Sequence, residues 1–146
     1  MFVGLQGAGK STWYRQHFAA THAHVSKDLM RSNRNKERRQ RQLIEGALRE
    51  GISVVVDNTN PSPEVRAPLV ELGRAHGARL VAVHFDVPLA VCEERNRRRE
   101  GNARVPDIAL HATLAKLAPP TREEGFDEVV VVRGDARHGT SVHRVL

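Results

Sequence analysis

The chain has 146 residues, with 23 Lys and Arg against 17 Asp and Glu, so its net charge is +6 at pH 7. This length suits a single domain with a sizeable core, and the one cysteine, Cys92, excludes an internal disulfide and fits a reducing compartment. The sequence has no signal peptide and no apolar run near the ~20 residues of a membrane span, so we expect a soluble, cytoplasmic protein.

The first predicted element is a short apolar strand at residues 1–3, which leads into Gly-Leu-Gln-Gly-Ala-Gly-Lys-Ser at residues 4–11. This pattern is a complete phosphate-binding loop, whose backbone N–H groups converge on nucleotide phosphates. We expect Lys10 to reach the β- and γ-phosphates and the Ser11 hydroxyl to bind Mg²⁺. The predicted nucleotide contacts in the loop are Gly7, Ala8, Gly9, Lys10, Ser11 and Thr12. The alternative is an ordinary glycine-rich turn that binds no phosphate.

Strands and helices alternate after the loop. Further strands are predicted at residues 22–25, 52–57, 79–85 and 128–132, and helices at residues 11–18, 34–50, 63–76, from 88 into the arginines at 95–99, and from 106 to before Pro119. The alternation predicts an α/β fold in three layers, with a mostly parallel sheet of about five strands and helices on both faces, in one domain over residues 1–146. Because the first strand is so short, either the true start of the chain lies upstream or this edge of the core is thin.

Two missing motifs bear on the fate of the nucleotide. Motor-type ATPases usually carry a glutamate after the acidic residue of the second motif, but here Asn58 follows Asp57. GTP switches carry Asn-Lys-x-Asp, and the only Asn-Lys pair here, at residues 35–36, is followed by Glu37 and Arg38. Both absences favour phosphoryl transfer to an acceptor over hydrolysis.

Asp28 follows the predicted strand at residues 22–25. Ligands of a parallel sheet lie at the carboxyl ends of its strands, so Asp28 belongs to the same rim as the phosphate-binding loop. Arg31 is one helical turn further on, and both side chains could face one acceptor. Transfer to a hydroxyl needs a base for its proton, which makes Asp28 a candidate. The alternative for Asp28 is a carboxylate that only meets a helix dipole.

Arginines gather in two places. The first cluster contains Arg31, Arg34, Lys36, Arg38, Arg39 and Arg41, and the second contains Arg95, Arg97, Arg98, Arg99 and Arg104. The first suggests a polyanionic partner, with a solvated surface as the alternative. The second predicts a lid at about residues 95–105 that offsets charge on the transferred phosphoryl group, with Arg95 and Arg99 on one helical face. The alternative here is a solvated helix end.

Four motifs in order carry a resemblance: residues 4–12; Ser26-Lys27-Asp28 with Arg31; residues 56–61; and residues 95–99 leading to Val105-Pro106. Over roughly residues 2–130 the chain resembles the 5′-kinase domain of polynucleotide kinases, both the phage enzyme and the repair kinase–phosphatase. The resemblance implies a P-loop kinase fold and ATP-dependent, Mg²⁺-dependent phosphorylation of a DNA or RNA 5′-hydroxyl.

The resemblance also implies roles for single residues. Asp28 matches the family's general base, and Arg31 matches an arginine on the 3′-phosphate side of the acceptor. Arg99 best matches the lid arginine on the donor phosphates, and Arg95 is a second candidate for nucleotide contact. Asp57 matches a family aspartate, and we expect it to orient either Arg31 or the hydrated metal. The alternative is that Asp57 only caps the turn after its strand.

The chain departs from the family where Lys27 replaces an arginine that usually precedes the base, and it carries no phosphatase or ligase module. Two other functions therefore stay open, a kinase of a small metabolite or of an aminoacyl-tRNA, and a nucleotide- or RNA-binding module without catalysis. His22 and His24 form a His-x-His pair, which we interpret as ordinary strand residues rather than metal ligands. The sequence does not predict the oligomeric state.

Overall fold

The computed structural model describes residues 1–135 and 139–145. Its strands are β1 (Phe2–Val3), β2 (His22–Val25), β3 (Ser53–Val56), β4 (Val81–Asp86), β5 (Glu128–Asp135) and β6 (Gly139–Val145). Its α-helices are α1 (Lys10–His17), α2 (Lys36–Arg49), α3 (Pro63–Ala75), α4 (Leu89–Arg97) and α5 (Asp107–Lys116). Three short 3₁₀ turns complete it, η1 (Lys27–Leu29), η2 (Gly101–Ala103) and η3 (Arg122–Glu124).

Polar caps and glycines set the ends of the two longest helices. The Asn35 side chain accepts the N–H of Arg38 at the beginning of α2, and Ser62 caps α3 in the same way. The helices α2 and α3 are followed by Gly51 and Gly77, whose φ angles of 72° and 68° are strained for residues with a Cβ. The helix α3 continues past Pro68 without interruption.

The strands form two hydrogen-bonded groups. One has the order β1-β4-β5-β6, in which β1 and β5 run parallel to β4 and β6 runs antiparallel to β5. The other is the parallel pair β2-β3. The groups meet at the carboxyl ends of β1 and β3, where Gly4 N–H donates to the Thr59 carbonyl at 3.0 Å and the Asn60 amide donates to the Phe2 carbonyl at 2.8 Å. These two bonds place the loop after β3 against the loop after β1.

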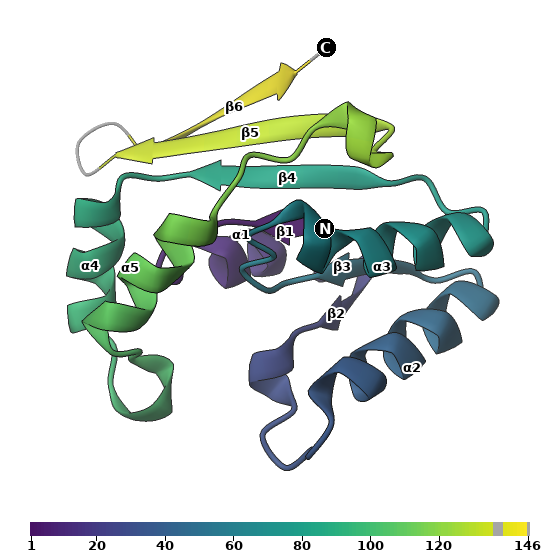
Figure 1. The fold of residues 1–146 in the computed structure, drawn as a ribbon, viewed down its shortest axis with the longest axis horizontal. Coiled ribbons are helices and arrows are strands. Elements are labelled where there is room, and N and C mark those ends of the chain that lie inside the picture. Colours follow the sequence, from purple (N-terminus) through teal and green to yellow (C-terminus); the bar gives the residue numbers. More distant parts are fainter. Residues whose placement is uncertain (136–138, 146) are drawn as a thin grey trace.

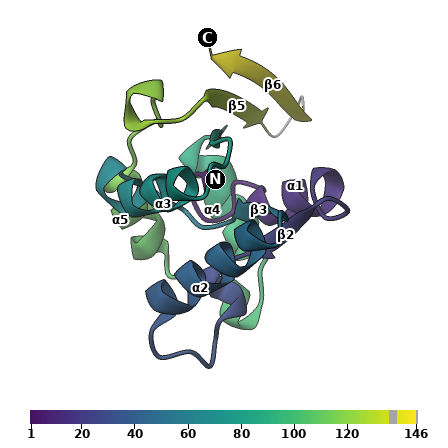
Figure 2. The same ribbon diagram turned by 90° about the vertical axis from the view of Figure 1, so that its right-hand side faces the viewer.

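Helices cover both faces of the strands, which gives three layers (Figures 1 and 2). Along β4, Val83 and Phe85 pack in a cluster with Tyr14 of α1, whereas Ala82 packs with Val70 of α3. This alternation follows from the two-residue period of a strand. Figure 1 shows that β4 and β5 point toward the side of the molecule where α4 and α5 lie, so this side carries the carboxyl ends of the strands.

The predicted α/β class, with a mostly parallel sheet between helices, is confirmed. Two expectations about its elements were wrong. The last predicted strand, at residues 128–132, continues through Gly134 to Asp135 and is followed by the antiparallel strand β6. The helical turn expected after Asp28 is the 3₁₀ turn η1, which ends at Leu29, so Arg31 lies in the turn beyond it.

Candidate active site

The loop at residues 4–11 connects β1 with α1 and folds as a cradle for an anion. Gly7 and Gly9 have φ angles of 80° and 93°, and a Cβ at Gly7 would lie 2.8 Å from the carbonyl oxygen of the buried Cys92. Among the described residues, the N–H groups of Gly7, Gly9 and Lys10 have no hydrogen-bond acceptor. Unpaired N–H groups at a helix N-terminus are what a phosphate group satisfies.

Lys10 is buried beneath this loop. Its ammonium group donates to the carbonyl oxygens of Gly4 at 3.0 Å and Leu5 at 2.7 Å. Burial lowers its pKa from 10.5 to about 8, although the carboxylates of Asp57 and Asp28 act in the opposite direction. Lys10 is therefore still mostly charged at pH 7, and its direct hydrogen-bond acceptors are two loop carbonyls.

Ser11 and Asp57 lie together at the beginning of α1 and just after β3. The Ser11 hydroxyl donates to Asp57 Oδ2 at 2.7 Å, and Asp57 is buried. A hydroxyl and a carboxylate are hard oxygen donors, the ligand type that Mg²⁺ prefers, directly or through its waters. The two residues thus fit the metal that the sequence implies. Asp57 also pairs with His24, which we interpreted from the sequence as an ordinary strand residue: His24 Nε2 lies 2.8 Å from the same oxygen of Asp57.

Asp28 lies in η1, and its side chain is exposed. The turn is held by the Ser26 hydroxyl, which accepts the Asp28 N–H at 3.3 Å, and by Asn58, which accepts the Lys27 N–H at 2.9 Å. Asn58 in turn donates to Gln40 of α2 at 2.7 Å. Residues from β3 and α2 therefore fix the backbone of Asp28, while its carboxylate stays open to solvent.

Arg31 is exposed in the turn after η1 and makes no hydrogen bond or ion pair within the described part of the chain. The structure thus places it near Asp28 along the chain but does not join the two side chains.

The arginines after residue 94 separate into two pairs. Arg95 donates to the Gly7 carbonyl at 3.3 Å, and Arg95 and Arg99 both line a pocket of about 440 Å³ beside the loop. Arg97 and Arg98 form ion pairs with glutamates of the preceding helical turn and point to solvent. The helix α4 ends at Arg97, so Arg99 does not extend its face as expected, yet it reaches the same pocket.

Asn96 closes the segment that contains these arginines. This buried side chain donates to the Val105 carbonyl at 2.7 Å and accepts the Val105 N–H at 3.0 Å. The two ends of the segment at residues 97–104 are therefore joined to each other, so the segment has the geometry of a flap on a fixed base. The sequence offered no signal for Asn96, because its partner is backbone across a turn.

A family model described as an AAA domain matches residues 1–120, which include the loop, Asp28, Asp57 and the arginines. The chain belongs to this family. Its fold is that of a P-loop kinase, as the structural comparison also indicates. The chain superposes on a sugar kinase from Janibacter sp. HTCC2649 with a TM-score of 0.65, over 90% of this chain and 82% of that one, at 19% identity.

Two curated relatives are similar to this chain in sequence. The chain is 27% identical over 133 residues to a bifunctional polynucleotide phosphatase/kinase of Schizosaccharomyces pombe, and 27% identical over 139 residues to a putative bifunctional polynucleotide phosphatase/kinase of Acanthamoeba polyphaga mimivirus. These matches cover 88% and 90% of this chain, which spans about a third of the length of each relative. In the described part of the chain, none of the helices combines the length and apolar composition that crossing a membrane requires.

Proposed function

We propose that this chain is an ATP-dependent kinase that phosphorylates the 5′-hydroxyl of a DNA or RNA end. The observation that carries the proposal is the exposed Asp28 carboxylate, on a turn held by Asn58, which follows the Asp57 that binds Ser11 of the phosphate-binding loop. A carboxylate at the mouth of a phosphate-binding loop is suited to take a proton from an acceptor. The names of the two curated relatives support a polynucleotide as that acceptor.

Donor binding belongs to the loop and the arginines. The unpaired N–H groups of Gly7, Gly9 and Lys10 would receive the phosphates of ATP, and the Lys10 ammonium would move from its loop carbonyls to them. Arg95 and Arg99 would approach from the opposite side of the pocket, within a lid at residues 95–105. Ser11 and Asp57 would hold Mg²⁺, which offsets negative charge on the donor phosphates when bound.

Acceptor activation belongs to the turn after β2. A carboxylate oxygen of Asp28 would accept the hydrogen bond of the 5′-hydroxyl and take its proton as the oxygen attacks the terminal phosphorus. Arg31 would contact the phosphate on the 3′ side of the terminal nucleotide. Because Asp28 is exposed before the acceptor arrives, no protein group has to leave for the hydroxyl to reach it.

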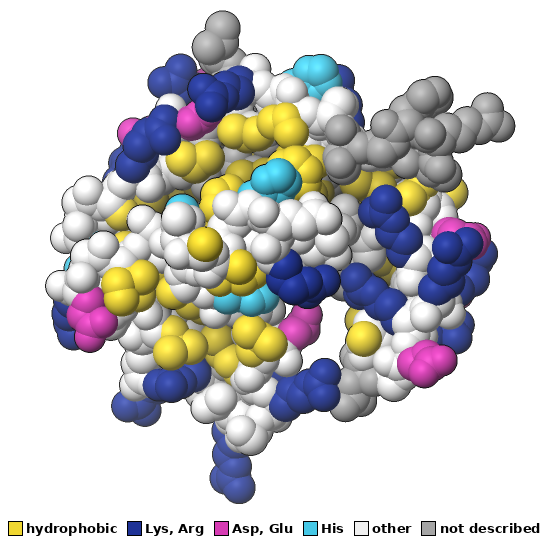
Figure 3. All heavy atoms as spheres, turned by 180° about the vertical axis from the view of Figure 1, so that it is seen from behind, with side chains coloured by type: hydrophobic (Ala, Val, Ile, Leu, Met, Phe, Trp, Pro, Cys, Tyr) yellow, Lys and Arg dark blue, Asp and Glu magenta, His cyan; other side chains and the backbone are white. Residues whose placement is uncertain are grey.

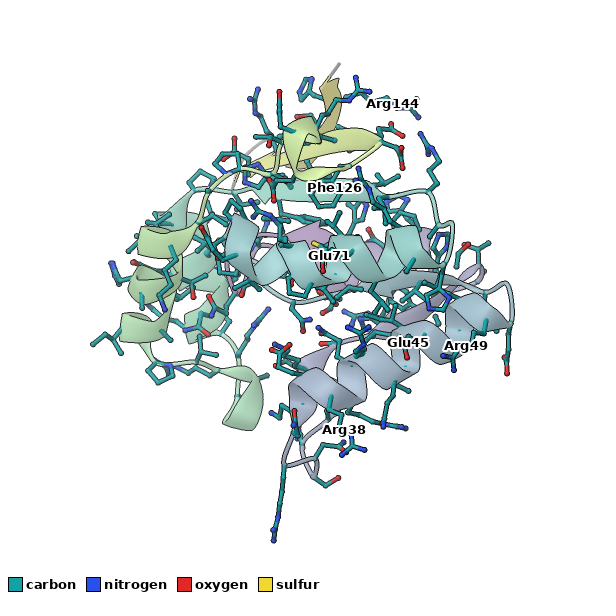
Figure 4. The ribbon with its side chains drawn as sticks, turned by 45° about the vertical axis from the view of Figure 1, so that its right-hand side comes forward. Arg38, Glu45, Arg49, Glu71, Phe126 and Arg144 are labelled. Atoms are coloured by element: carbon teal, nitrogen blue, oxygen red, sulfur yellow. The ribbon has the colours of Figure 1, made fainter. Side chains whose placement is uncertain are left out.

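The charges of α2 favour a polymeric acceptor over a small metabolite. Among the described residues, the cations at and near α2 form two groups. Arg41 and Arg49 pair with Glu45, whereas the cations nearer Asp28 have no acidic partner. These form the α2 N-terminal cluster, which contains Arg34, Lys36, Arg38 and Arg39. Figure 4 shows Glu45 and Arg49 together along α2 and Arg38 apart from them, toward its beginning. On the face seen in Figure 3, several Lys and Arg side chains lie around a hollow, together with an acidic side chain at its edge.

The test is transfer of labelled phosphate from ATP to single-stranded DNA and RNA with 5′-hydroxyl ends, beside a panel of sugars and nucleosides. We expect transfer to an oligonucleotide, and we expect Asp28→Asn to lower its rate about 10²–10⁴-fold while ATP affinity is kept. The matched control is Glu71→Gln, which removes an exposed carboxylate on α3 (Figure 4) and should leave the rate unchanged.

Two outcomes would count against the proposal. Transfer to a metabolite, with no transfer to either oligonucleotide, would show that the acceptor is a small molecule and not a polynucleotide. A rate for Asp28→Asn equal to that of Glu71→Gln would show that Asp28 is not the base.

We also propose the cytoplasm as the compartment, in keeping with the free thiol of Cys92.

A further inference from the structure

The Asp57 carboxylate receives two hydrogen bonds on one oxygen. The Ser11 hydroxyl lies 2.7 Å and His24 Nε2 lies 2.8 Å from Oδ2. A carboxylate only accepts, so Nε2 carries the hydrogen of this imidazole. Among the described residues, Asp57 Oδ1 has no hydrogen-bond partner. One oxygen of the buried carboxylate is therefore used by the protein, and the other stays available.

The imidazole of His24 is itself fixed from two elements. Its strand, β2, pairs with β3 in a register that sets His24 beside Val55, two residues before Asp57. The Tyr14 ring of α1 stacks on the imidazole with 3.9 Å between ring centroids and 17° between planes. The Tyr14 hydroxyl is anchored to the His22 carbonyl at 2.6 Å. The donor that faces Asp57 is thus held by a strand register and by the helix that carries Ser11.

We propose that His24 is a positioning residue for the Mg²⁺ site formed by Ser11 and Asp57. Its Nε2–H holds the carboxylate so that Oδ2 keeps the Ser11 hydroxyl and Oδ1 remains free for the ion or one of its waters. Hydrogen bonds to a ligating carboxylate commonly decide how well the metal is bound. The inference rests on the proposed function only for the metal role of Ser11 and Asp57, and it does not depend on which acceptor is phosphorylated.

A purely architectural role of His24 makes a different prediction. If the bond to Asp57 only joined β2 to β3, its loss would lower the free energy of unfolding and would weaken nucleotide binding equally with and without metal. A positioning role affects the metal-dependent part alone. The discriminating quantity is therefore the ratio of ADP affinity in Mg²⁺ to ADP affinity in EDTA.

The experiment measures this ratio by calorimetry, together with the melting temperature, for the full chain and three variants. His24→Leu removes the donor, His24→Gln keeps an N–H donor at a similar reach, and His22→Gln is the matched control on the same strand. We expect His24→Leu to bind ADP about 10–100-fold more weakly in Mg²⁺, while its ADP affinity in EDTA changes little. His24→Gln should retain most of the metal effect, and His22→Gln all of it.

Equal ratios for His24→Leu and His22→Gln would overturn the inference, and so would a wild-type chain whose ADP affinity does not respond to Mg²⁺. If His24→Leu does not fold, His24→Asn replaces it, because its amide is one methylene too short to reach Asp57. If ADP binding depends on Mg²⁺, and this dependence requires His24, but no oligonucleotide is phosphorylated, the proposed acceptor is wrong and this inference still holds.

Discussion

At the scale of single residues, the buried Lys10 gives the proposed kinase a dependence on pH. Burial lowers its pKa to about 8, so the free protein loses this charge above that pH. Donor phosphates bind the protonated form, and ADP affinity should therefore fall about tenfold per pH unit above pH 8. Calorimetry of ADP binding without metal, from pH 6.5 to about 9.5, measures the decline.

The control for this prediction is Lys10→Arg, because a guanidinium stays protonated throughout that range. Any affinity that this variant keeps should be flat above pH 8. Proton uptake on binding, seen as a buffer-dependent heat at pH 9 in the native chain alone, would be a second signature. A native chain with constant affinity up to pH 9.5 would show that the charge of Lys10 is not what holds the donor.

The sequence predicted the loop residues because their spacing within one motif carries the chemistry, whereas Asp57 was a candidate only through the resemblance to a known family. It did not predict His24 as the partner of Asp57. Their bond joins two strands and depends on the β2–β3 register, which no local pattern states. The sequence did pair Arg95 with Arg99 by their spacing, and the structure brings both to the pocket beside the loop while Arg97 and Arg98 pair with glutamates.

At the scale of elements, the beginning of α2 carries an electrostatic cost. Lys36, Arg38 and Arg39 stand in or next to its first turn, where the positive end of the helix dipole disfavours cations by about 0.3–1 kcal/mol each. Within the described residues only Lys27, from η1, pairs with the single acid of that turn, Glu37. A partner that supplies negative charge, such as the proposed nucleic-acid acceptor, would offset this cost.

The change that tests this partner is Arg34→Gln, Arg38→Gln and Arg39→Gln combined. We expect weaker binding of a single-stranded oligonucleotide and a slope of log K against log salt that is reduced by about 2, since each lost contact releases about 0.7 counterion. The same change should raise the melting temperature, because the helix dipole no longer meets these cations. Filter binding from 50 to about 200 mM salt measures the slope.

The control is Arg41→Gln with Arg49→Gln, which removes two cations that already pair with Glu45. Its salt slope should stay close to that of the native chain. An unchanged salt slope in the triple variant would show that the α2 N-terminal cluster is a solvated surface that does not contact the oligonucleotide.

Helix and strand positions followed from apolar periodicity and from Pro, Gly and Asn at their ends, and most bounds lie within two residues of expectation. The exceptions have physical reasons. The strand β6 has few apolar side chains at its edge of the sheet, so periodicity does not mark it. The turn η1 became 3₁₀ because Ser26 caps the Asp28 N–H and Asn58 holds Lys27, which ends the helical run early.

At the scale of the whole molecule, one buried arginine ties three distant segments together. Arg66 of α3 is fully buried, forms a two-point ion pair with Glu124 at 2.8 and 3.1 Å, and donates to the carbonyls of Asn60 and Ala118. Asn60 in turn binds the Phe2 carbonyl at the base of the phosphate-binding loop. Burial raises the pKa of Glu124, but the hydrogen bonds from Arg66 and Thr121 outweigh it and the net pKa is lowered.

Removing one partner of this pair should therefore be costly. Arg66→Met leaves the Glu124 carboxylate without its cationic partner and two carbonyls without donors, and we expect the free energy of unfolding to fall by about 3–5 kcal/mol. Arg66→Met combined with Glu124→Leu should recover part of the loss, because no uncompensated charge remains. Urea unfolding at pH 7 measures both variants. The control is Arg79→Met, which breaks a solvent-exposed pair with Glu128 and should cost about 0–1 kcal/mol. If Arg66→Met costs no more than Arg79→Met, the phosphate-binding loop does not depend on this arginine for its support.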